Sequence, residues 1–187
     1  MNGGLLQRNL SKVFPNKLAV SAAEIFLLLL AGAIAITLHS RLRMPLHIPG
    51  RQGLFFIAII MAASYFSKYS FAASVSCFGA AILLYFNMLG YNDPFMPLVY
   101  MVVGVIIDVL TRVSSKISKS IFILAMAAGL GWASIPLIRM ALSLLTGFPF
   151  HSLASGLLFP VFTHFVSGYA GAVVGLSLSI LVTKNKK

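Results

Sequence analysis

Residues 18–38 read LAVSAAEIFLLLLAGAIAITL, and this stretch decides what kind of protein the chain encodes. Its length matches the roughly 20 apolar residues that a helix needs to cross a bilayer. A signal-peptide core is only about 7–15 residues long, so the stretch is predicted to stay as a first transmembrane helix. Glu24 is its one charged residue. Because a carboxylate is costly to bury alone, we expect Glu24 to find a partner or to take up a proton.

The composition of the whole chain also indicates a membrane protein. Of the 187 residues, 59% are hydrophobic and 9% are charged, whereas soluble domains carry about 25% charged residues. The sequence therefore predicts an all-α integral membrane bundle that forms one domain over residues 1–187. Six transmembrane helices are expected, at about residues 18–39, 53–67, 70–90, 95–113, 119–146 and 157–183.

Charge predicts how these helices cross the membrane. The 14 basic residues outnumber the 3 acids, which gives a formal net charge of +11. The basic residues lie mainly in short loops beside apolar runs, as the positive-inside rule and anionic lipid predict, so no nucleic-acid partner is expected. Six crossings with both termini in the cytoplasm place most of them inside. A re-entrant second helix would instead put Arg112, Lys116 and Lys119 outside, against the rule.

A basic loop is predicted between the first two helices, at residues 40–52. The segment from Arg41 to Gly53 reads RLRMPLHIPGRQG. Its prolines lack an amide donor and its glycines permit positive φ, so we expect a shaped loop. Four basic residues then lie on the outer face: Arg41, Arg43, Arg51 and Arg139. Together they predict a pocket that attracts an anion, with snorkelling of each arginine to lipid headgroups as the alternative.

Further polar and aromatic residues are expected near this outer face. They are His39, His47, Asn87, Asn92, Asp93, Trp132, His151 and His164, with Tyr85, Tyr91 and Tyr100 nearby in sequence. Apolar walls with a few polar groups suit a small polar ligand that contains a ring, although an interfacial aromatic belt is the alternative for Tyr and Trp. The residues predicted to bind substrate are Arg41, Arg43, His47, Arg51, Asn92, Asp93, Arg139 and His164.

Small residues recur at helical spacing on two of the predicted helices. On the first helix the pairs are Ala19 with Ala23 and Ala31 with Ala35, and on the last helix the row is Ser167, Gly171, Gly175 and Ser179. Such ridges let helix backbones approach closely in lipid. We expect the last helix to use its ridge for packing within the bundle. For the first helix, an external partner competes with that interpretation.

The sequence contains no known catalytic motif of the hydrolase, zinc-protease or nucleotide-binding types. Its three acids, Glu24, Asp93 and Asp108, are scattered, so they cannot build a metal cluster or a two-carboxylate site. We expect no enzyme activity, no cofactor and no metal. Asp108 is instead expected to pair with Arg112, four residues further on the same helix face.

The chain length, the six predicted helices, the Ala19 and Ala23 pair and the long outer loop resemble the substrate-binding S components of energy-coupling factor (ECF) vitamin transporters. The resemblance implies that Ala19 and Ala23 dock on a transmembrane coupling subunit, with Ala31 and Ala35 as the alternative pair. It implies that the segment from Arg41 to Gly53 gates the ligand pocket.

The same resemblance implies two cytoplasmic ATPases as partners and a multi-pass location in a bacterial or archaeal cell membrane. The expected function is to capture a small, vitamin-like, anionic solute from outside and to deliver it through the coupling subunit. Two other functions remain open. A structural membrane protein like the rod-shape MreD family has a similar length and helix count, and its outer loop need bind nothing. A small membrane enzyme would use His47, His151 or His164 as a base.

Overall fold

The computed structural model describes residues 5–14, 16–42, 50, 53–154 and 156–185. Within these ranges the chain forms seven α-helices and one short 3-10 helix. They are α1 (Leu5–Val13), α2 (Lys17–Arg41), α3 (Gly53–Phe66), α4 (Ala72–Tyr85), α5 (Met96–Ile117), α6 (Ile121–Thr146), η1 (His151–Leu153) and α7 (Leu158–Lys184). In the described chain, α2, α5, α6 and α7 are long and apolar enough to cross a membrane, and α3 and α4 are shorter apolar helices. The prediction of an all-α membrane bundle is confirmed.

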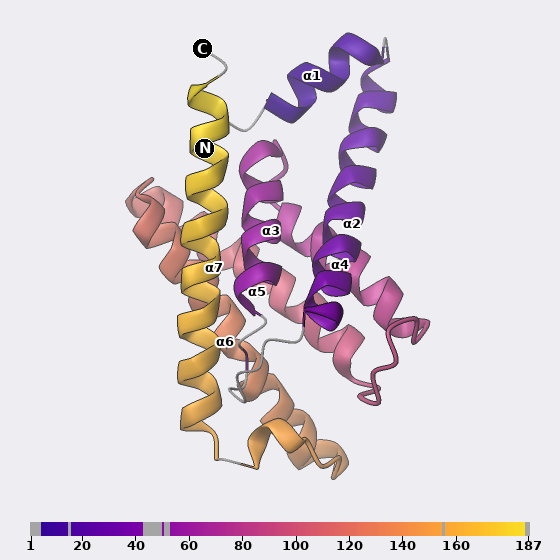
Figure 1. Ribbon diagram of the computed structural model, residues 1–187, viewed down its shortest axis with the longest axis vertical. Coiled ribbons are helices and arrows are strands. Elements are labelled where there is room, and N and C mark those ends of the chain that lie inside the picture. The colour runs from indigo at the N-terminus through magenta and orange to yellow at the C-terminus, as the bar shows by residue number, and fades with distance from the viewer. Residues whose placement is uncertain (1–4, 15, 43–49, 51–52, 155, 186–187) are drawn as a thin grey trace.

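The apolar helices form a closed ring. Each packs on two neighbours in the order α2, α4, α5, α6, α7 and α3, and α3 closes the ring against α2. α1 lies across the end of the bundle where α2 begins and α7 ends (Figure 1). The α4–α5 connection and η1 lie toward the opposite end (Figure 1). We call these two ends the α1 end and the loop end.

Two helices differ from the sequence-based expectation. α4 stops at Tyr85 rather than near residue 90, because Asn87 and Gly90 have φ values of 50° and 69°. Such left-handed backbone cannot continue an α-helix. α1 is a helix that was not expected. Its leucines, such as Leu10, are half-buried while Arg8 is exposed, which is typical of a helix that lies in a membrane surface.

The last helix packs closely on the third. A Cβ atom on Gly171 would collide with the carbonyl oxygen of Leu54, and a Cβ atom on Gly175 would collide with that of Ala58. Only glycine lets the backbones of α7 and α3 come this near, which is how small residues hold helices together in lipid. The expected use of this ridge for packing within the bundle is confirmed.

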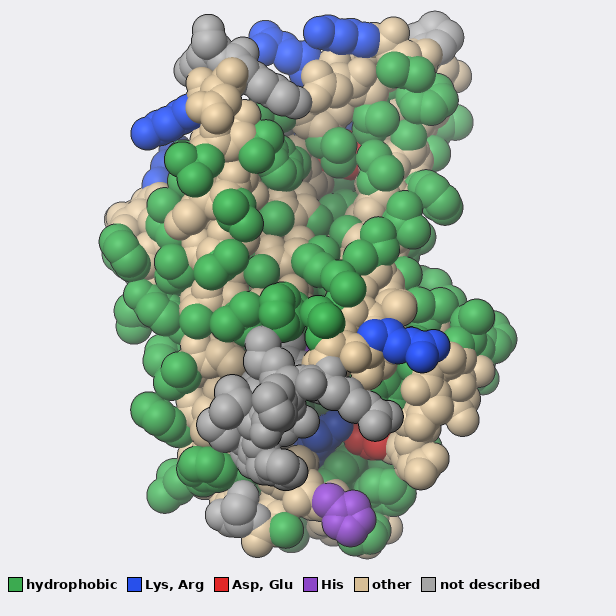
Figure 2. Space-filling view, in the orientation of Figure 1, with side chains coloured by type: hydrophobic (Ala, Val, Ile, Leu, Met, Phe, Trp, Pro, Cys, Tyr) green, Lys and Arg blue, Asp and Glu red, His purple; other side chains and the backbone are tan. Residues whose placement is uncertain are grey.

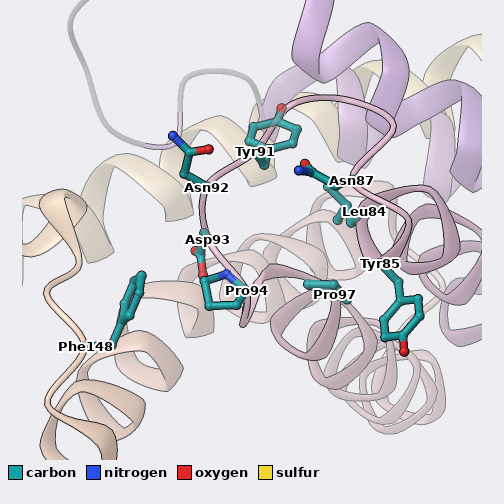
Figure 3. A pocket seen from close by; sticks show the side chains of 9 residues that line it. All are labelled: Leu84, Tyr85, Asn87, Tyr91, Asn92, Asp93, Pro94, Pro97 and Phe148. Carbon is teal, nitrogen blue, oxygen red and sulfur yellow. The ribbon is translucent and has the colours of Figure 1, made fainter.

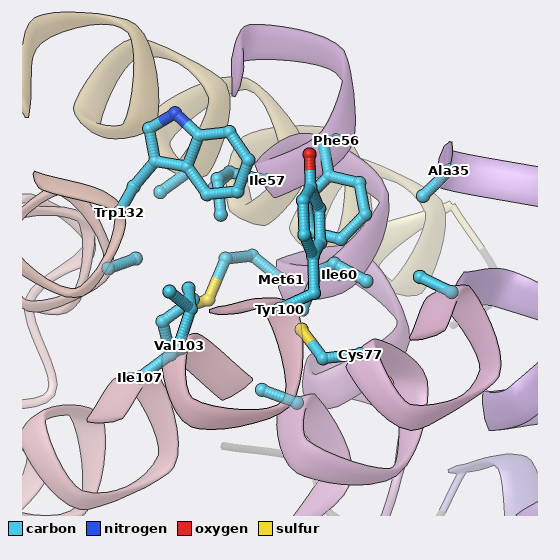
Figure 4. Close-up of a cluster of buried hydrophobic side chains, with 14 of the residues drawn as sticks. Ala35, Phe56, Ile57, Ile60, Met61, Cys77, Tyr100, Val103, Ile107 and Trp132 are labelled. Atoms are coloured by element: carbon cyan, nitrogen blue, oxygen red, sulfur yellow. The ribbon is translucent and has the colours of Figure 1, made fainter. Parts of the chain in front are cut away.

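The centre of the bundle is a dense apolar core to which all six apolar helices of the described chain contribute. α3 supplies Phe56, Ile60 and Met61, which are at most 1% exposed, and Figure 4 shows them beside Tyr100 of α5 and Trp132 of α6. Many large apolar side chains also lie on the outside of the bundle, and they cover much of the face shown in Figure 2. Packing inside and hydrocarbon outside therefore both favour apolar side chains, as expected for a bundle in a bilayer.

Asp108 fixes the start of α4. Its carboxylate accepts hydrogen bonds from the backbone N–H groups of Ala73 (3.1 Å) and Ser74 (2.7 Å), and another from the Ser74 hydroxyl. Arg112 donates instead to the Ser70 hydroxyl, at 2.7 Å. The expected ion pair between Asp108 and Arg112 is therefore absent from the described part of the chain, because the unsatisfied N–H groups at the start of α4 attract the carboxylate more directly.

Candidate functional site

Five buried aromatic rings from five different helices meet in the interior of the bundle. They are His39 of α2, Phe56 of α3, Tyr100 of α5, Trp132 of α6 and His164 of α7, and we call them the ring cluster. Phe56 stacks on Trp132 with ring centroids 5.2 Å apart and meets Tyr100 edge-on at 5.0 Å. These are the separations at which aromatic pairs attract one another beyond simple burial. The cluster is thus a set of mutually packed rings to which five helices contribute.

The ring cluster also contains buried polar atoms. The Tyr100 hydroxyl lies 3.4 Å from Nε2 of His39, and the His39 ring meets the Phe56, Tyr100 and Trp132 rings edge-on at 6.2–6.3 Å. Nε1 of Trp132 is buried and has no hydrogen-bond partner among the described residues. A buried N–H donor without a partner is costly. Such a donor is what a bound polar molecule would satisfy.

The end of the loop after α2 contacts the ring cluster through His164. Gly50 has a φ of 76°, and a Cβ atom there would lie 2.6 Å from Cγ of His164. The Ser167 hydroxyl donates a hydrogen bond to the Gly50 carbonyl at 2.8 Å, and Gly53 N–H donates to the same carbonyl at 2.8 Å. His164 itself has Nδ1 2.7 Å from the Pro160 carbonyl oxygen. Gly50 is therefore held directly against α7 beside a cluster histidine.

Arg139 and Asp93 form an ion pair toward the loop end. Nη2 of Arg139 lies 2.9 Å from Oδ2 of Asp93, and the two side chains are 16% and 18% exposed. Nη1 of Arg139 donates to the Ser152 hydroxyl at 3.2 Å, and its guanidinium lies 5.6 Å from the centre of the Phe150 ring. Oδ1 of Asp93 accepts from the N–H of Phe95 at 3.0 Å. Both charges are consequently fixed by several contacts, unlike a flexible arginine that snorkels to lipid.

One nitrogen of the Arg139 guanidinium, Nε, is buried and has no hydrogen-bond partner within the described ranges. Arg139 lies on α6 two turns beyond Trp132, so the cation and one ring of the cluster share a helix. A carboxylate or phosphate that displaced Asp93 would meet a guanidinium already held in place, which favours the bidentate geometry that arginine offers.

A groove of about 590 Å³ opens beside Asp93, within the usual size range of ligand pockets. Its lining residues come mainly from the end of α4 and the α4–α5 connection, and they are Leu84, Tyr85, Asn87, Tyr91, Asn92, Asp93, Pro94, Pro97 and Phe148. Phe148 and Tyr85 stand at opposite sides of it (Figure 3). Burial raises the pKa of Tyr91 above its ordinary value, so its hydroxyl remains a neutral donor at neutral pH.

The structure brings some of the predicted substrate-binding residues together. Asp93 and Arg139 form the ion pair, Asn92 lines the groove, and His164 belongs to the ring cluster. Arg41 is exposed at the end of α2 and lines a separate pocket of about 350 Å³ with Met88, Leu89 and Gly90. The remaining predictions, Arg43, His47 and Arg51, lie outside the described residues, as does most of the loop at 40–52.

Several residues of the site did not stand out in the sequence. Phe56 lies in a continuous apolar run, and Ser152 and Phe150 lie in a short connection without a motif. The only sequence signal for Phe150 and Ser152 was their nearness to Arg139 along the chain. Within the described residues, no group of three or more His, Cys, Asp or Glu side chains is arranged to hold a metal ion.

The alanines of the predicted docking face have unequal surroundings. Ala19, Ala23 and Ala31 are half-buried on α2, but Ala35 is fully buried in the core. Because the Ala35 side chain already packs inside the bundle, Ala19 and Ala23 stay the predicted docking pair rather than the alternative pair, Ala31 and Ala35. The α2 residues that face outward are larger, such as Phe26, which is 63% exposed.

No protein-family model, curated protein or solved structure matches this chain. Its description therefore depends on its own sequence and structure. The chain is a multi-pass membrane helical bundle with a cluster of aromatic and histidine rings inside it and an ion-paired arginine toward the loop end.

Proposed function

We propose that the chain is the membrane-embedded, substrate-binding subunit of an ECF-type importer. It captures a small, vitamin-like, anionic solute from outside the cell and passes it to a transmembrane coupling subunit that two cytoplasmic ATPases power. It does no chemistry on the solute. It works in a bacterial or archaeal cell membrane with both termini in the cytoplasm.

The observation that carries this proposal is the fixed Arg139. Isolated basic side chains near a membrane surface normally extend to lipid headgroups, but this guanidinium is held by Asp93 and Ser152, and its Nε has no partner among the described residues. Two turns away on the same helix, the buried Trp132 stacks on Phe56 and has an N–H group without a hydrogen-bond partner among the described residues. A cation next to aromatic walls suits a planar molecule that carries a carboxylate or a phosphate.

The distribution of charge supports the orientation in this proposal. Basic residues gather at the α1 end (Figure 2), and by the positive-inside rule that end faces the cytoplasm. Arg139 and Asp93 then face outward, where a solute arrives. The half-buried Ala19 and Ala23 lie near the cytoplasmic start of α2, the side on which a coupling subunit and its ATPases would engage.

Native mass spectrometry of the protein, purified gently from its own host, tests the proposal. We expect a stoichiometric small molecule with an acidic group, or a complex with a second membrane subunit and an ATPase pair. The matched sample carries Arg139→Ala and should lose the small molecule while keeping the subunits. Co-purification of cell-wall proteins with an empty bundle would contradict the proposal and support the structural, MreD-like alternative.

A further inference from the structure

A second binding surface lies at the α1 end, far from the ring cluster along α2. A groove of about 720 Å³ opens there between α1, the first turns of α2 and the turn that follows α3. Its lining residues are Gln7, Arg8, Ser11, Phe14, Lys17, Val20, Ser21 and Lys68. Three of them are cations, and none of these described lining residues is an acid. The groove thus combines positive charge with neutral hydrogen-bonding groups.

Glu24 explains why Lys68 stands at this groove. Glu24 is fully buried one turn below Val20 and Ser21, and its Oε1 accepts hydrogen bonds from the Lys68 N–H at 2.9 Å and from the Ser67 hydroxyl at 2.7 Å. The carboxylate therefore fixes the turn after α3, and the Lys68 side chain extends from that turn. Even with Glu24 ionised, the three cations leave a positive surplus at the groove.

The surroundings of the groove are those of a membrane surface. α1 presents half-buried leucines on one side and exposed polar residues on another, as helices in a membrane interface do. Phe14 lines the groove, and next to it along the chain Val13 and Leu18 are 72% and 76% exposed. Apolar side chains this exposed beside the cations provide contact for acyl chains, which a free ion does not need.

We propose that this groove binds the headgroup of an anionic phospholipid. The phosphate lies among Arg8, Lys17 and Lys68 and accepts a hydrogen bond from the Ser21 hydroxyl, while the acyl chains run along Phe14, Leu18 and the lipid-facing side of α2. The volume is adequate for a headgroup, since ligand sites of about 300–1,000 Å³ are usual. This inference is independent of the proposed transport function, because it concerns the other end of the bundle.

Lipid-resolved native mass spectrometry tests this inference on the full chain, with phosphatidylglycerol and phosphatidylcholine titrated in the same detergent. We expect one phosphatidylglycerol to bind at least about tenfold more tightly than phosphatidylcholine, because each basic residue at an anionic surface contributes about 1 kcal/mol, which is roughly fivefold in affinity. The triple variant Arg8→Gln, Lys17→Gln, Lys68→Gln should lose this preference.

The matched control removes the same charge outside the groove, with Lys116→Gln, Lys119→Gln and Lys184→Gln, and should change the preference by less than about twofold. A second variant, Ser21→Trp, fills the groove without changing charge and should abolish the preference by itself. It decides the question if the triple variant does not fold, as judged by circular dichroism and gel filtration.

Three results would overturn the inference. The first is an equal affinity of the natural sequence for the two lipids. The second is an equal loss in the groove variant and the control, which would mean that lipid responds only to overall charge. The third is displacement of the lipid by excess inorganic phosphate, which would assign the groove to a free ion.

Discussion

The two ends of the bundle use their charges in opposite ways. Toward the loop end, Arg139 is held by Asp93 at 2.9 Å and by Ser152, and little of either charge is exposed. At the α1 end, Arg8 and Lys17 line an open groove and no acid lines it with them among the described residues. A fixed, neutralised cation can select one ligand by geometry, whereas open cations attract any nearby anion. The difference agrees with the proposed solute site at one end and the proposed lipid site at the other.

The variant with the largest expected effect tests whether the α1 end also binds a partner subunit. The double change Ala19→Leu, Ala23→Leu should abolish co-purification of a coupling subunit while leaving bound solute unchanged, because larger side chains prevent close helix approach. Native mass spectrometry reports both quantities on one sample. Ala22→Leu is the matched control, since Ala22 is exposed on the same turns. Normal assembly of the double variant would remove the docking assignment.

Removing the Arg139 charge should show that the two ends of the bundle have different functions, because it should affect solute binding and not assembly. Arg139→Ala is expected to lower the occupancy of the co-purifying solute by more than tenfold, because the anionic group loses its partner. Assembly should be intact. Arg112→Ala is the control, since Arg112 also donates to a serine hydroxyl but lies near the end of α5, whereas Asp93 precedes the start of that helix. Unchanged occupancy would class Arg139 as a purely structural residue.

Replacing Asp93, the partner of Arg139, should have the opposite effect on solute binding. Asp93→Asn keeps the shape of the side chain but removes the charge that competes with an anionic solute, so occupancy should rise severalfold. Stability should fall by about 1–3 kcal/mol, because the Arg139 charge loses its ionic partner. Thermal unfolding in detergent and solute titration measure the two effects. A fall in occupancy would show that the solute needs the Asp93 carboxylate itself.

Asp108 provides the smallest test, because the hydrogen bonds of its carboxylate within the described residues go only to the start of α4. Asp108→Asn should reduce stability by about 1–2 kcal/mol, since an amide serves the N–H groups of Ala73 and Ser74 less well than a carboxylate. Solute occupancy and lipid preference should both stay as they are. The measurement is thermal unfolding beside native mass spectrometry of the same preparation. Loss of solute would place Asp108 in the binding machinery.

The sequence predicts the bundle well because membrane crossing depends on length and hydropathy alone. Apolar runs and loop charges suffice to place most of the helices. The same uniform hydropathy hides which side of each helix faces the core. Phe56 and Phe55 are adjacent in one apolar run, yet only Phe56 is fully buried among the aromatic rings. In lipid, both faces of a helix favour apolar residues, so the period that reveals a soluble core is missing.

The sequence predicts how deep a charged residue lies in the membrane better than it predicts which residue that charge contacts. Helix rise places Arg139 near a membrane surface, but its partner Asp93 is 46 residues away, in a connection whose path depends on where α4 ends. For Asp108, the spacing along α5 predicts an ion pair with Arg112, but in the structure the carboxylate binds the start of α4 instead. Ala35 is buried by neighbouring helices and Ala23 is only half-buried. The spacing of small residues along α2 does not reveal this difference.

The brevity of α4 has a consequence for the membrane itself. Its 14 residues rise about 21 Å, against about 30 Å of hydrocarbon, while α6 and α7 have 26 and 27 residues. Aromatic residues that favour the interface bracket its lipid-facing side, with Phe71 before it and Tyr85 and Phe86 at its end. The protein thus has unequal hydrophobic thickness around its circumference, and the bilayer is expected to thin where it meets α4.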